Sequence, residues 1–391
     1  MKITDFETFD CELGWRTVSF LKISTESGLS GWSEYVESFG NGGLTAVINR
    51  LRGNVVGKDA ARNGLIVAEL AVGIGPAPSG INRQAVGAIE NALLDLKARS
   101  LGVPVADLIG GSLRSTIPVY WSHCGTYRQG AQAGFVGKNP VGSYSELRDF
   151  ARDLRDSGFS YFKTNMIAFE DEGLRRRPQP WTRRPSAPGR EWDRRSIVAI
   201  ENTLSAFREG LGTDVNLILD INIGFTAEGV RRIAEAVEPY DLEWLELDGL
   251  SPRTMSDVRA FSSTPLASGE SLFGRGEYQP YFDAHSVDLA IVDAVWNGVG
   301  EAAKIANAAQ TVGLDIAPHN FYGHLSTMMS AQLCSAVPNV SILEVDIDGV
   351  SWRDDLLSQP PVYQDGYLMI PDGPGWGVEV NEEAVRAHAG Y

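Results

Sequence analysis

The sequence predicts an α/β fold in which a closed barrel follows a smaller α+β domain. From residue 115 onward, eight short apolar runs alternate with helical patterns, whereas the first 50 residues read as an antiparallel meander. Apolar strands separated by helices indicate a parallel sheet with helices on its outer face, and eight such units are the number that closes a barrel. In such barrels the functional side chains lie at the carboxyl ends of the strands.

The smaller domain is predicted for residues 1–113. Its strands are expected at residues 2–12, 17–25 and 29–35. Apolar residues at three- and four-residue spacing then predict a helix over residues 84–101, which Gly102 and Pro104 end.

The barrel is predicted for residues 114–345. Its eight strands are expected at residues 117–124, 161–166, 215–221, 242–247, 265–270, 287–293, 313–319 and 340–345. The remaining residues, 346–391, leave this pattern and are expected to return to the first domain. One connection, of 48 residues between Met166 and Val215, holds eight arginines within residues 175–195. It is interpreted as a surface excursion or subunit contact, or as a lid that brings positive charge to the site.

Charge and composition exclude several classes of protein. The chain has 34 Lys and Arg against 50 Asp and Glu, a net charge of −16, which argues against a general nucleic-acid binder. The chain has no run of 18 apolar residues, so no membrane span is expected. The first residues lack the apolar core of a signal peptide. Cys11, Cys124 and Cys334 are odd in number and far apart, which suggests free thiols in a reducing cytoplasm.

Three acidic residues, Asp220, Glu246 and Glu270, end consecutive predicted strands. Glu246 follows Asp220 by 26 residues, and Glu270 follows Glu246 by 24. Each interval is about the length of one strand–helix unit, so all three side chains should share one rim. Close carboxylates repel each other, and a hard divalent cation that prefers oxygen ligands, with Mg²⁺ the natural candidate, would relieve this repulsion. The alternative is three independent exposed carboxylates at helix N-termini.

Other polar residues end the neighbouring strands. Lys163 is interpreted as a cation beside the metal that holds a substrate carboxylate, or as an ordinary surface lysine. His319 and Asp293 end adjacent strands, and a carboxylate that orients an imidazole is the usual arrangement for a catalytic base. His123, at the end of the first strand, is a weaker candidate for contact with substrate.

These residues belong to an ordered set of motifs that resembles the enolase superfamily and, within it, the mandelate racemase-like subgroup. The set comprises Gly31-Trp32-Ser33-Glu34, residues 88–97, Gly102-Val103-Pro104, Asp220-Ile221-Asn222, Glu246, Ser268-Gly269-Glu270, the Asp293–His319 dyad, Glu344 and Pro374-Gly375-Trp376-Gly377. The resemblance implies a modified TIM (β/α)7β-type barrel with an α+β capping domain, Mg²⁺ as the cofactor, and Asp220, Glu246 and Glu270 as its ligands.

The resemblance also implies a chemistry, abstraction of the proton α to a carboxylate to form an enediolate. Lys163 and the metal would bind its charge, His319 would be the base, and Glu344, if protonated, would donate a hydrogen bond to the other carboxylate oxygen. The subgroup usually has a second lysine where this chain has Asn165. Because a racemase needs bases on both faces of the substrate, a one-base reaction is favoured.

The leading hypothesis is therefore dehydration of a sugar acid, an aldonate or aldarate, to a 2-keto-3-deoxy acid. Alternatives are an epimerase, racemase or cycloisomerase with a second base such as His123, a binding protein that retains the metal site, and nucleic-acid binding through the arginine-rich segment.

Substrate contacts are expected from Asn165, Asn222, His123, and Trp15 and Arg16 of the capping domain, although exposed turn residues are the alternative for the last two. A second capping loop, residues 37–43, is expected to close over the site. The expected partner is a small acid sugar, with no nucleic acid or membrane, and the expected protein is a cytoplasmic homo-oligomer.

Overall fold

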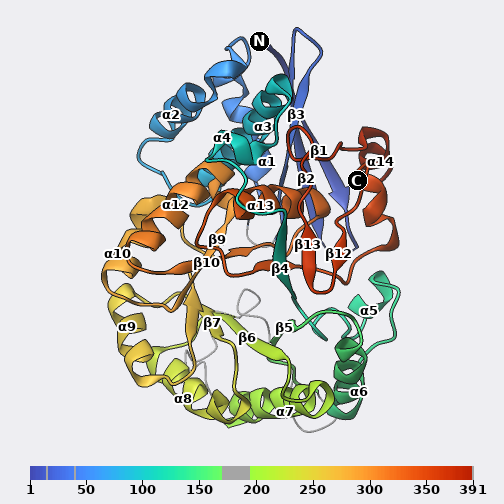
Figure 1. Cartoon of the computed structure of the whole chain (residues 1–391), viewed down its shortest axis with the longest axis vertical. Helices are drawn as coiled ribbons and strands as arrows, with labels where there is room; N and C mark the ends of the chain where they lie inside the picture. The colour runs from blue at the N-terminus through green and yellow to red at the C-terminus, as the bar shows by residue number, and fades with distance from the viewer. Residues whose placement is uncertain (15, 39–40, 170–193, 390–391) are drawn as a thin grey trace.

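The structure of the chain is a computed structural model that describes residues 1–391 except 15, 39–40, 170–193 and 390–391. Two parts follow one another along its longest axis (Figure 1). A small sheet with helices forms a cap at one end, and a ring of strands surrounded by helices forms the other. No helix in the described part of the chain is both long and apolar enough to cross a bilayer.

The cap is built on an antiparallel sheet of three strands in chain order, as the alternating sequence predicted. The strands are β1 (Ile3–Glu12), β2 (Thr17–Thr25) and β3 (Ser30–Tyr35), and the helices are α1 (Leu44–Leu51), α2 (Asn63–Gly73), α3 (Ile81–Leu101) and α4 (Val105–Leu108). Helix α3 packs directly on β3. Gly31 permits this contact, because a Cβ there would overlap the carbonyl oxygen of Ala92.

The barrel contains eight parallel strands, which confirms all eight predicted runs. They are β4 (Thr116–Trp121), β5 (Tyr161–Asn165), β6 (Asn216–Ile223), β7 (Leu245–Asp248), β8 (Leu266–Ser268), β9 (Leu289–Asp293), β10 (Asp315–His319) and β11 (Leu343–Val345). Neighbours pair in chain order from β4 to β10, and β11 pairs with β4. A bridge between Ile316 and Val340 joins β10 to the segment before β11 and closes the ring.

Helices cover the outside of the barrel (Figure 1). They are α5 (Gln132–Phe135), α6 (Tyr144–Arg155), α7 (Arg194–Leu211), α8 (Ala227–Val237), α9 (Pro252–Phe261), α10 (Gly274–Asp283), α11 (Ala294–Asn297), α12 (Val299–Thr311) and α13 (His324–Ala336). After β11 the chain forms a 3-10 helix, Ser351–Leu356, in place of an α-helix. In the part of the chain that the structure describes, seven barrel strands are thus followed by α-helices and the eighth by a 3-10 helix, which is the modified (β/α)7β form that the resemblance implied.

The last segment of the chain returns to the cap. A hairpin of β12 (Tyr363–Gln364) and β13 (Tyr367–Met369) first pairs antiparallel with the start of β4. Trp376 is then fully buried and donates from Nε1 to the carbonyl oxygen of Trp32 (2.7 Å). Helix α14 (Glu382–Ala387) lies beside β1. The division of the chain at residues 113 and 345 stays a prediction.

A buried glutamate of the cap fixes it against the carboxyl-terminal side of the barrel strands. Glu34, on β3, accepts hydrogen bonds from the backbone nitrogens of Gly323 (2.6 Å) and Ser326 (3.0 Å), where α13 begins. Helix α13 follows β10 directly, so this contact holds the cap over the end of the barrel where the strand-end side chains meet. Burial raises the pKa of Glu34 to about 7, although these two hydrogen bonds favour its charged form.

We expect Glu34→Ala to lower the free energy of unfolding by about 1–3 kcal/mol, because two buried N–H groups would lose their acceptor. Urea unfolding followed by tryptophan fluorescence measures this change. Glu383→Ala, at an exposed position of α14, is the matched control and should change stability by less than about 0.5 kcal/mol. Equal effects of the two substitutions would show that Glu34 does not join the cap to the barrel.

Candidate active site

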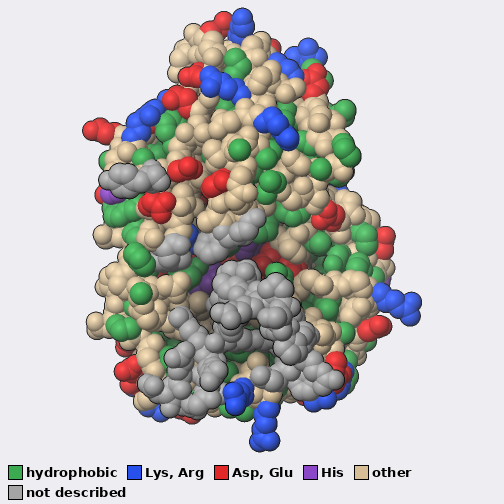
Figure 2. All heavy atoms as spheres, turned by 180° about the vertical axis from the view of Figure 1, so that it is seen from behind, with side chains coloured by type: hydrophobic (Ala, Val, Ile, Leu, Met, Phe, Trp, Pro, Cys, Tyr) green, Lys and Arg blue, Asp and Glu red, His purple; other side chains and the backbone are tan. Residues whose placement is uncertain are grey.

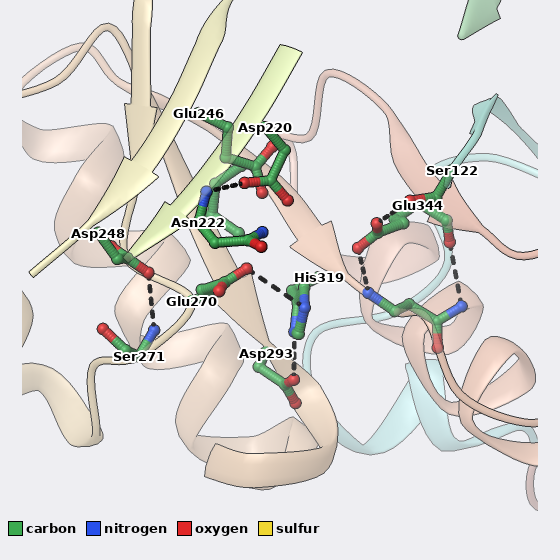
Figure 3. Close-up of polar contacts among 12 residues, drawn as sticks. Ser122, Asp220, Asn222, Glu246, Asp248, Glu270, Ser271, Asp293, His319 and Glu344 are labelled. Carbon is green, nitrogen blue, oxygen red and sulfur yellow. Dashed lines mark hydrogen bonds and ion pairs between the residues drawn. The ribbon is translucent and has the colours of Figure 1, made fainter. Parts of the chain in front are cut away.

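Three carboxylates converge at the ends of the neighbouring strands β6, β7 and β8 (Figure 3). Asp220, Glu246 and Glu270 each offer an oxygen, and these three oxygens lie within 4.8 Å of one another. Asp220 and Glu246 are direct partners in the strand register, so the barrel itself places them side by side. Two of the three are buried, which excludes the alternative of three independent exposed side chains.

Local hydrogen bonds orient the carboxylates of the first two strands. Asp220 accepts through Oδ1 from the backbone nitrogen of Asn222 (2.7 Å), which has a left-handed φ of 57°. Glu246 accepts through Oε2 from Trp244 Nε1 (2.9 Å). The other oxygens of these two carboxylates, Asp220 Oδ2 and Glu246 Oε1, both face the ammonium of Lys163.

Asp248 orients the third carboxylate, although it was not among the predicted site residues. Its oxygens accept from the backbone nitrogens of Gly269 (2.8 Å) and Ser271 (3.1 Å), on either side of Glu270 (Figure 3). Gly269 has a φ of 128°, a conformation that favours glycine. The sequence could have indicated Asp248, because it lies two residues after Glu246 and therefore on the same face of the strand.

Lys163 is buried among carboxylates, so the interpretation as a surface lysine is wrong. Its Nζ lies 2.8 Å from Glu344, 3.0 Å from Glu246 and 3.7 Å from Asp220, and its side chain is 2% exposed. Burial disfavours the charged ammonium, but these carboxylates outweigh it and hold the pKa of Lys163 well above its ordinary value. The ammonium therefore lies between Glu344 and two of the metal-ligand candidates, Asp220 and Glu246.

His319 and Asp293 form the expected dyad. Nδ1 of His319 lies 2.7 Å from Asp293 Oδ2, and Nε2 lies 3.3 Å from Glu270 Oε2 (Figure 3). Tyr322 also donates its hydroxyl to Asp293 (2.5 Å). Burial disfavours the imidazolium, but Glu270 and Asp293 outweigh it and raise the pKa of His319 to about 10.

Both oxygens of Glu344 have protein partners, and its expected role as a protonated donor to substrate stays a prediction. It accepts from Ser122 Oγ (2.5 Å) and the backbone nitrogen of Asn320 (2.9 Å), and it pairs with Lys163. Burial opposes its ionisation, yet Lys163 and His319 hold its pKa below the ordinary range. Glu344 is therefore an ionised acceptor in this arrangement.

The two asparagines predicted to contact substrate lie near the carboxylates. Asn165 accepts from Thr126 Oγ1 (3.0 Å) and donates to the carbonyl oxygen of Asp220 (3.1 Å), so both ends of its amide have protein partners. Asn222 lies next to Asp220 and Glu270 (Figure 3). Contact of either residue with substrate stays a prediction.

Arg16 is not the exposed turn residue that was the alternative interpretation. It is 3% exposed, forms an ion pair with Asp346 (3.0 Å), and donates to the carbonyl oxygens of Phe321 and Tyr322. The cap loop thus reaches into the barrel end, and because the guanidinium is engaged there, the geometry does not favour it as a substrate contact. Trp15, residues 39 and 40 of the second loop and residues 175–193 of the arginine-rich segment lie outside the described residues.

The site opens to solvent between the cap and the barrel. Figure 2 shows histidine and acidic side chains at the floor of a hollow between the two parts. The set of three carboxylate oxygens suits a hard divalent cation, because oxygen ligands and negative charge are what such ions require. A cation site, a buried ammonium and a histidine–aspartate dyad therefore face one space.

We expect Glu270→Gln to lower the pKa of His319 clearly below 10, because the amide removes the charge that supports the imidazolium. NMR titration of the histidine ring nitrogens, in chelator to exclude metal, measures this value. Asp354→Asn is the matched control, since Asp354 pairs with His324 (2.7 Å) and should leave the titration of His319 unchanged. An unshifted pKa in Glu270→Gln would contradict the ion pair.

Two protein-family models match the chain. The model of the enolase C-terminal domain-like family matches residues 146–384, and that of the mandelate racemase / muconate lactonizing enzyme N-terminal domain matches residues 12–110. A D-xylonate dehydratase of Haloferax volcanii is 28% identical over 99% of this chain and 89% of its own length. A D-galactonate dehydratase of Xanthomonas campestris is 27% identical over 99% and 94%.

Solved structures are similar over the whole chain. A crystal structure from Burkholderia xenovorans, provisionally assigned as an L-alanine-DL-glutamate epimerase, has a TM-score of 0.94 and 41% identity and covers 99% of this chain and 98% of its own. A second, bound to magnesium and fumarate, has a TM-score of 0.91 and 40% identity and covers 99% and 96%. The family matches, the barrel and the strand-end residues together show that the chain belongs to the enolase superfamily, in its mandelate racemase-like subgroup.

Proposed function

We propose that the protein is a Mg²⁺-dependent dehydratase of a sugar acid, an aldonate or aldarate, and thus a carbon–oxygen lyase. The observation that carries this proposal is that Nε2 of His319 lies 3.3 Å from Glu270, one of the three carboxylates that suit a cation. A base at that distance from a cation site can reach the carbon next to a bound carboxylate. The names of the D-xylonate, D-galactonate and D-gluconate dehydratases among the relatives support the same reaction.

Asp220, Glu246 and Glu270 would hold the Mg²⁺ ion. When bound, the ion supplies positive charge to the substrate carboxylate and to the enediolate that forms from it. Lys163 contributes a second positive charge from the protein, because its ammonium lies between Glu246 and Glu344 and can donate a hydrogen bond to a carboxylate oxygen. Stabilisation of developing negative charge by groups already in place is a major source of catalysis.

His319 is the proposed base. It takes the proton from C2 of the substrate at Nε2, while Asp293 on Nδ1 holds the ring in the required orientation. Nε2 must be neutral before it can accept a proton, and Glu270 supports its protonated form here. A cation held by Glu270 would weaken that support and would leave His319 free to act as a base.

Loss of water then follows from the enediolate. The electrons of the broken C2–H bond form a C2–C3 double bond, and the 3-hydroxyl leaves as water after it gains a proton. The enol takes up a proton at C3 and loses one from the C2 hydroxyl, which gives the 2-keto-3-deoxy acid. Asn165 disfavours a two-base racemisation, because an amide cannot accept a proton as a lysine would.

An epimerase remains the second candidate. The provisional assignment of two similar structures as L-alanine-DL-glutamate epimerases and the presence of a second histidine, His123, favour it. Exchange of the α-proton with solvent deuterium, with no 2-keto acid formed, would identify this reaction. The homo-oligomeric state and the cytoplasmic location stay predictions from the sequence.

We expect the purified enzyme with Mg²⁺ to release a 2-keto acid from at least one member of a library of four-, five- and six-carbon sugar acids. Semicarbazide detects the product. His319→Asn should lower kcat by about 10²–10⁴-fold, the usual contribution of a general base. His285→Asn, at an exposed histidine with a φ of 50°, is the matched control and should retain activity. No product from any member would show that the proposal is wrong.

A further inference from the structure

A second histidine–aspartate pair lies at the barrel end, and the proposed dehydration gives it no role so far. His123 follows β4 and Asp346 follows β11, and these neighbouring strands bring the two side chains together. Nδ1 of His123 lies 3.3 Å from Asp346 Oδ1 and 3.0 Å from Ser122 Oγ. Among the described residues, none forms a hydrogen bond or ion pair with its Nε2. The arrangement parallels that of His319 and Asp293, with one ring nitrogen held by the protein and the other available.

The backbone and the neighbouring rings hold His123 in one position. Its φ is 55°, a left-handed conformation that costs a residue with a side chain about 1 kcal/mol or more. The imidazole stacks on Tyr127, with ring centres 4.6 Å apart and planes 14° from parallel. Its centre lies 5.6 Å from the centre of the Phe321 ring. A strained residue whose ring is fixed on two sides is typical of a functional position.

Shared neighbours link His123 to the proposed base and to the proposed carboxylate-binding lysine. The ring of Phe321 lies beside both imidazoles, with its centre 5.6 Å from that of His123 and 5.0 Å from that of His319. The hydroxyl of Ser122, which contacts His123 Nδ1, also donates to Glu344 (2.5 Å), the partner of Lys163. The side chain of His123 is 17% exposed, so part of it is open to solvent.

Asp346 links this histidine to the cap. Its Oδ2 pairs with the buried guanidinium of Arg16, and its Oδ1 faces His123. Arg16 compensates the charge of Asp346, so the carboxylate can hold Nδ1 of the imidazole without remaining a buried, unpaired anion. The charged or titratable groups around the ring are thus Asp346, Arg16, Glu344 and Tyr127.

We propose that His123 is the general acid of the reaction, on the basis of the proposed dehydratase function. Its imidazolium donates the Nε2 proton to the 3-hydroxyl as the C3–O bond breaks, and the bonding electron pair leaves with the oxygen as water. His319 has by then taken the C2 proton, so the two histidines divide the tasks of base and acid. Asp346 is a positioning residue that holds His123 through Nδ1, and solvent returns the proton to His123 after each turnover.

The test is His123→Asn, assayed on a sugar acid that the wild type dehydrates. Asparagine is among the side chains that tolerate a left-handed φ best, so this change removes the imidazole with little added strain. We expect kcat for dehydration to fall at least about 100-fold, within the usual range for a general acid. In D₂O, NMR should show deuterium entering C2 of the recovered acid, because His319 still removes the proton. His319→Asn should lose both activities, and His285→Asn should retain both.

A 3-deoxy-3-fluoro analogue of the same acid separates acid catalysis from a loss of binding or folding. Fluoride can leave without first taking a proton, so His123→Asn should eliminate it within about fivefold of the wild-type rate. Asp346→Asn should give the same pattern, with dehydration lost and both C2 exchange and fluoride elimination retained.

Dehydration by His123→Asn within about fivefold of the wild type would overturn this inference alone. Equal loss of dehydration, exchange and fluoride elimination would also overturn it, because His123 would then serve binding or structure. Absence of any 2-keto acid from the wild type would instead overturn the proposed function, and this inference with it.

Discussion

The buried ion cluster around Lys163 is the interaction on which the rest of the site depends. Four carboxylates meet at one end of the barrel, and at an effective dielectric constant of about 20 two like charges 4 Å apart repel by about 4 kcal/mol. The ammonium of Lys163 contacts Asp220, Glu246 and Glu344 and compensates part of this charge. Removal of one partner from such a buried cluster leaves uncompensated charge and costs several kcal/mol. Lys163 thus links Glu344 to Asp220 and Glu246. One ammonium does not neutralise all of these carboxylates, so negative charge remains that a cation can compensate.

Around this cluster, residues of a second layer orient each reactive group. Asp248 holds the turn that presents Glu270, Asp293 holds the ring of His319, and Glu34 holds the cap against α13. The ion pair of Arg16 with Asp346 carries the cap loop into the same end of the barrel. The cap therefore acts on the site through buried contacts, and a change in the cap loop alters the surroundings of the barrel residues.

Most of the fold could be predicted because the pattern is local and repeated. The strand-end residues from Asp220 to Glu344 follow one another at nearly equal steps, and one strand–helix unit per step places them on one rim. The ligand set and the dyad follow from this regularity. The sequence also shows Asn165 at the position where the subgroup usually has a lysine. The structure adds that both ends of the Asn165 amide form hydrogen bonds within the protein.

What could not be predicted depends on contacts between distant parts of the chain. Arg16 and Asp346 are 330 residues apart, and no local pattern shows that the first buries its guanidinium against the second. Asp248 reads in the sequence as one more acid beside Glu246, and only the fold shows that it binds the backbone beside Glu270. The charge state of Glu344 likewise depends on Lys163 and His319, which the barrel brings to it from other strands.

The central claim is that the cation site, Lys163 and the dyad together stabilise an enediolate. Calorimetric titration with the hydroxamate of an aldonic acid tests it, because the planar hydroxamate anion offers two oxygens to a cation, as an enediolate does. We expect the hydroxamate to bind at least about tenfold more tightly than the parent aldonate when Mg²⁺ is present, and to lose its binding in chelator. Equal affinity for the two compounds, or binding that persists without metal, would contradict it.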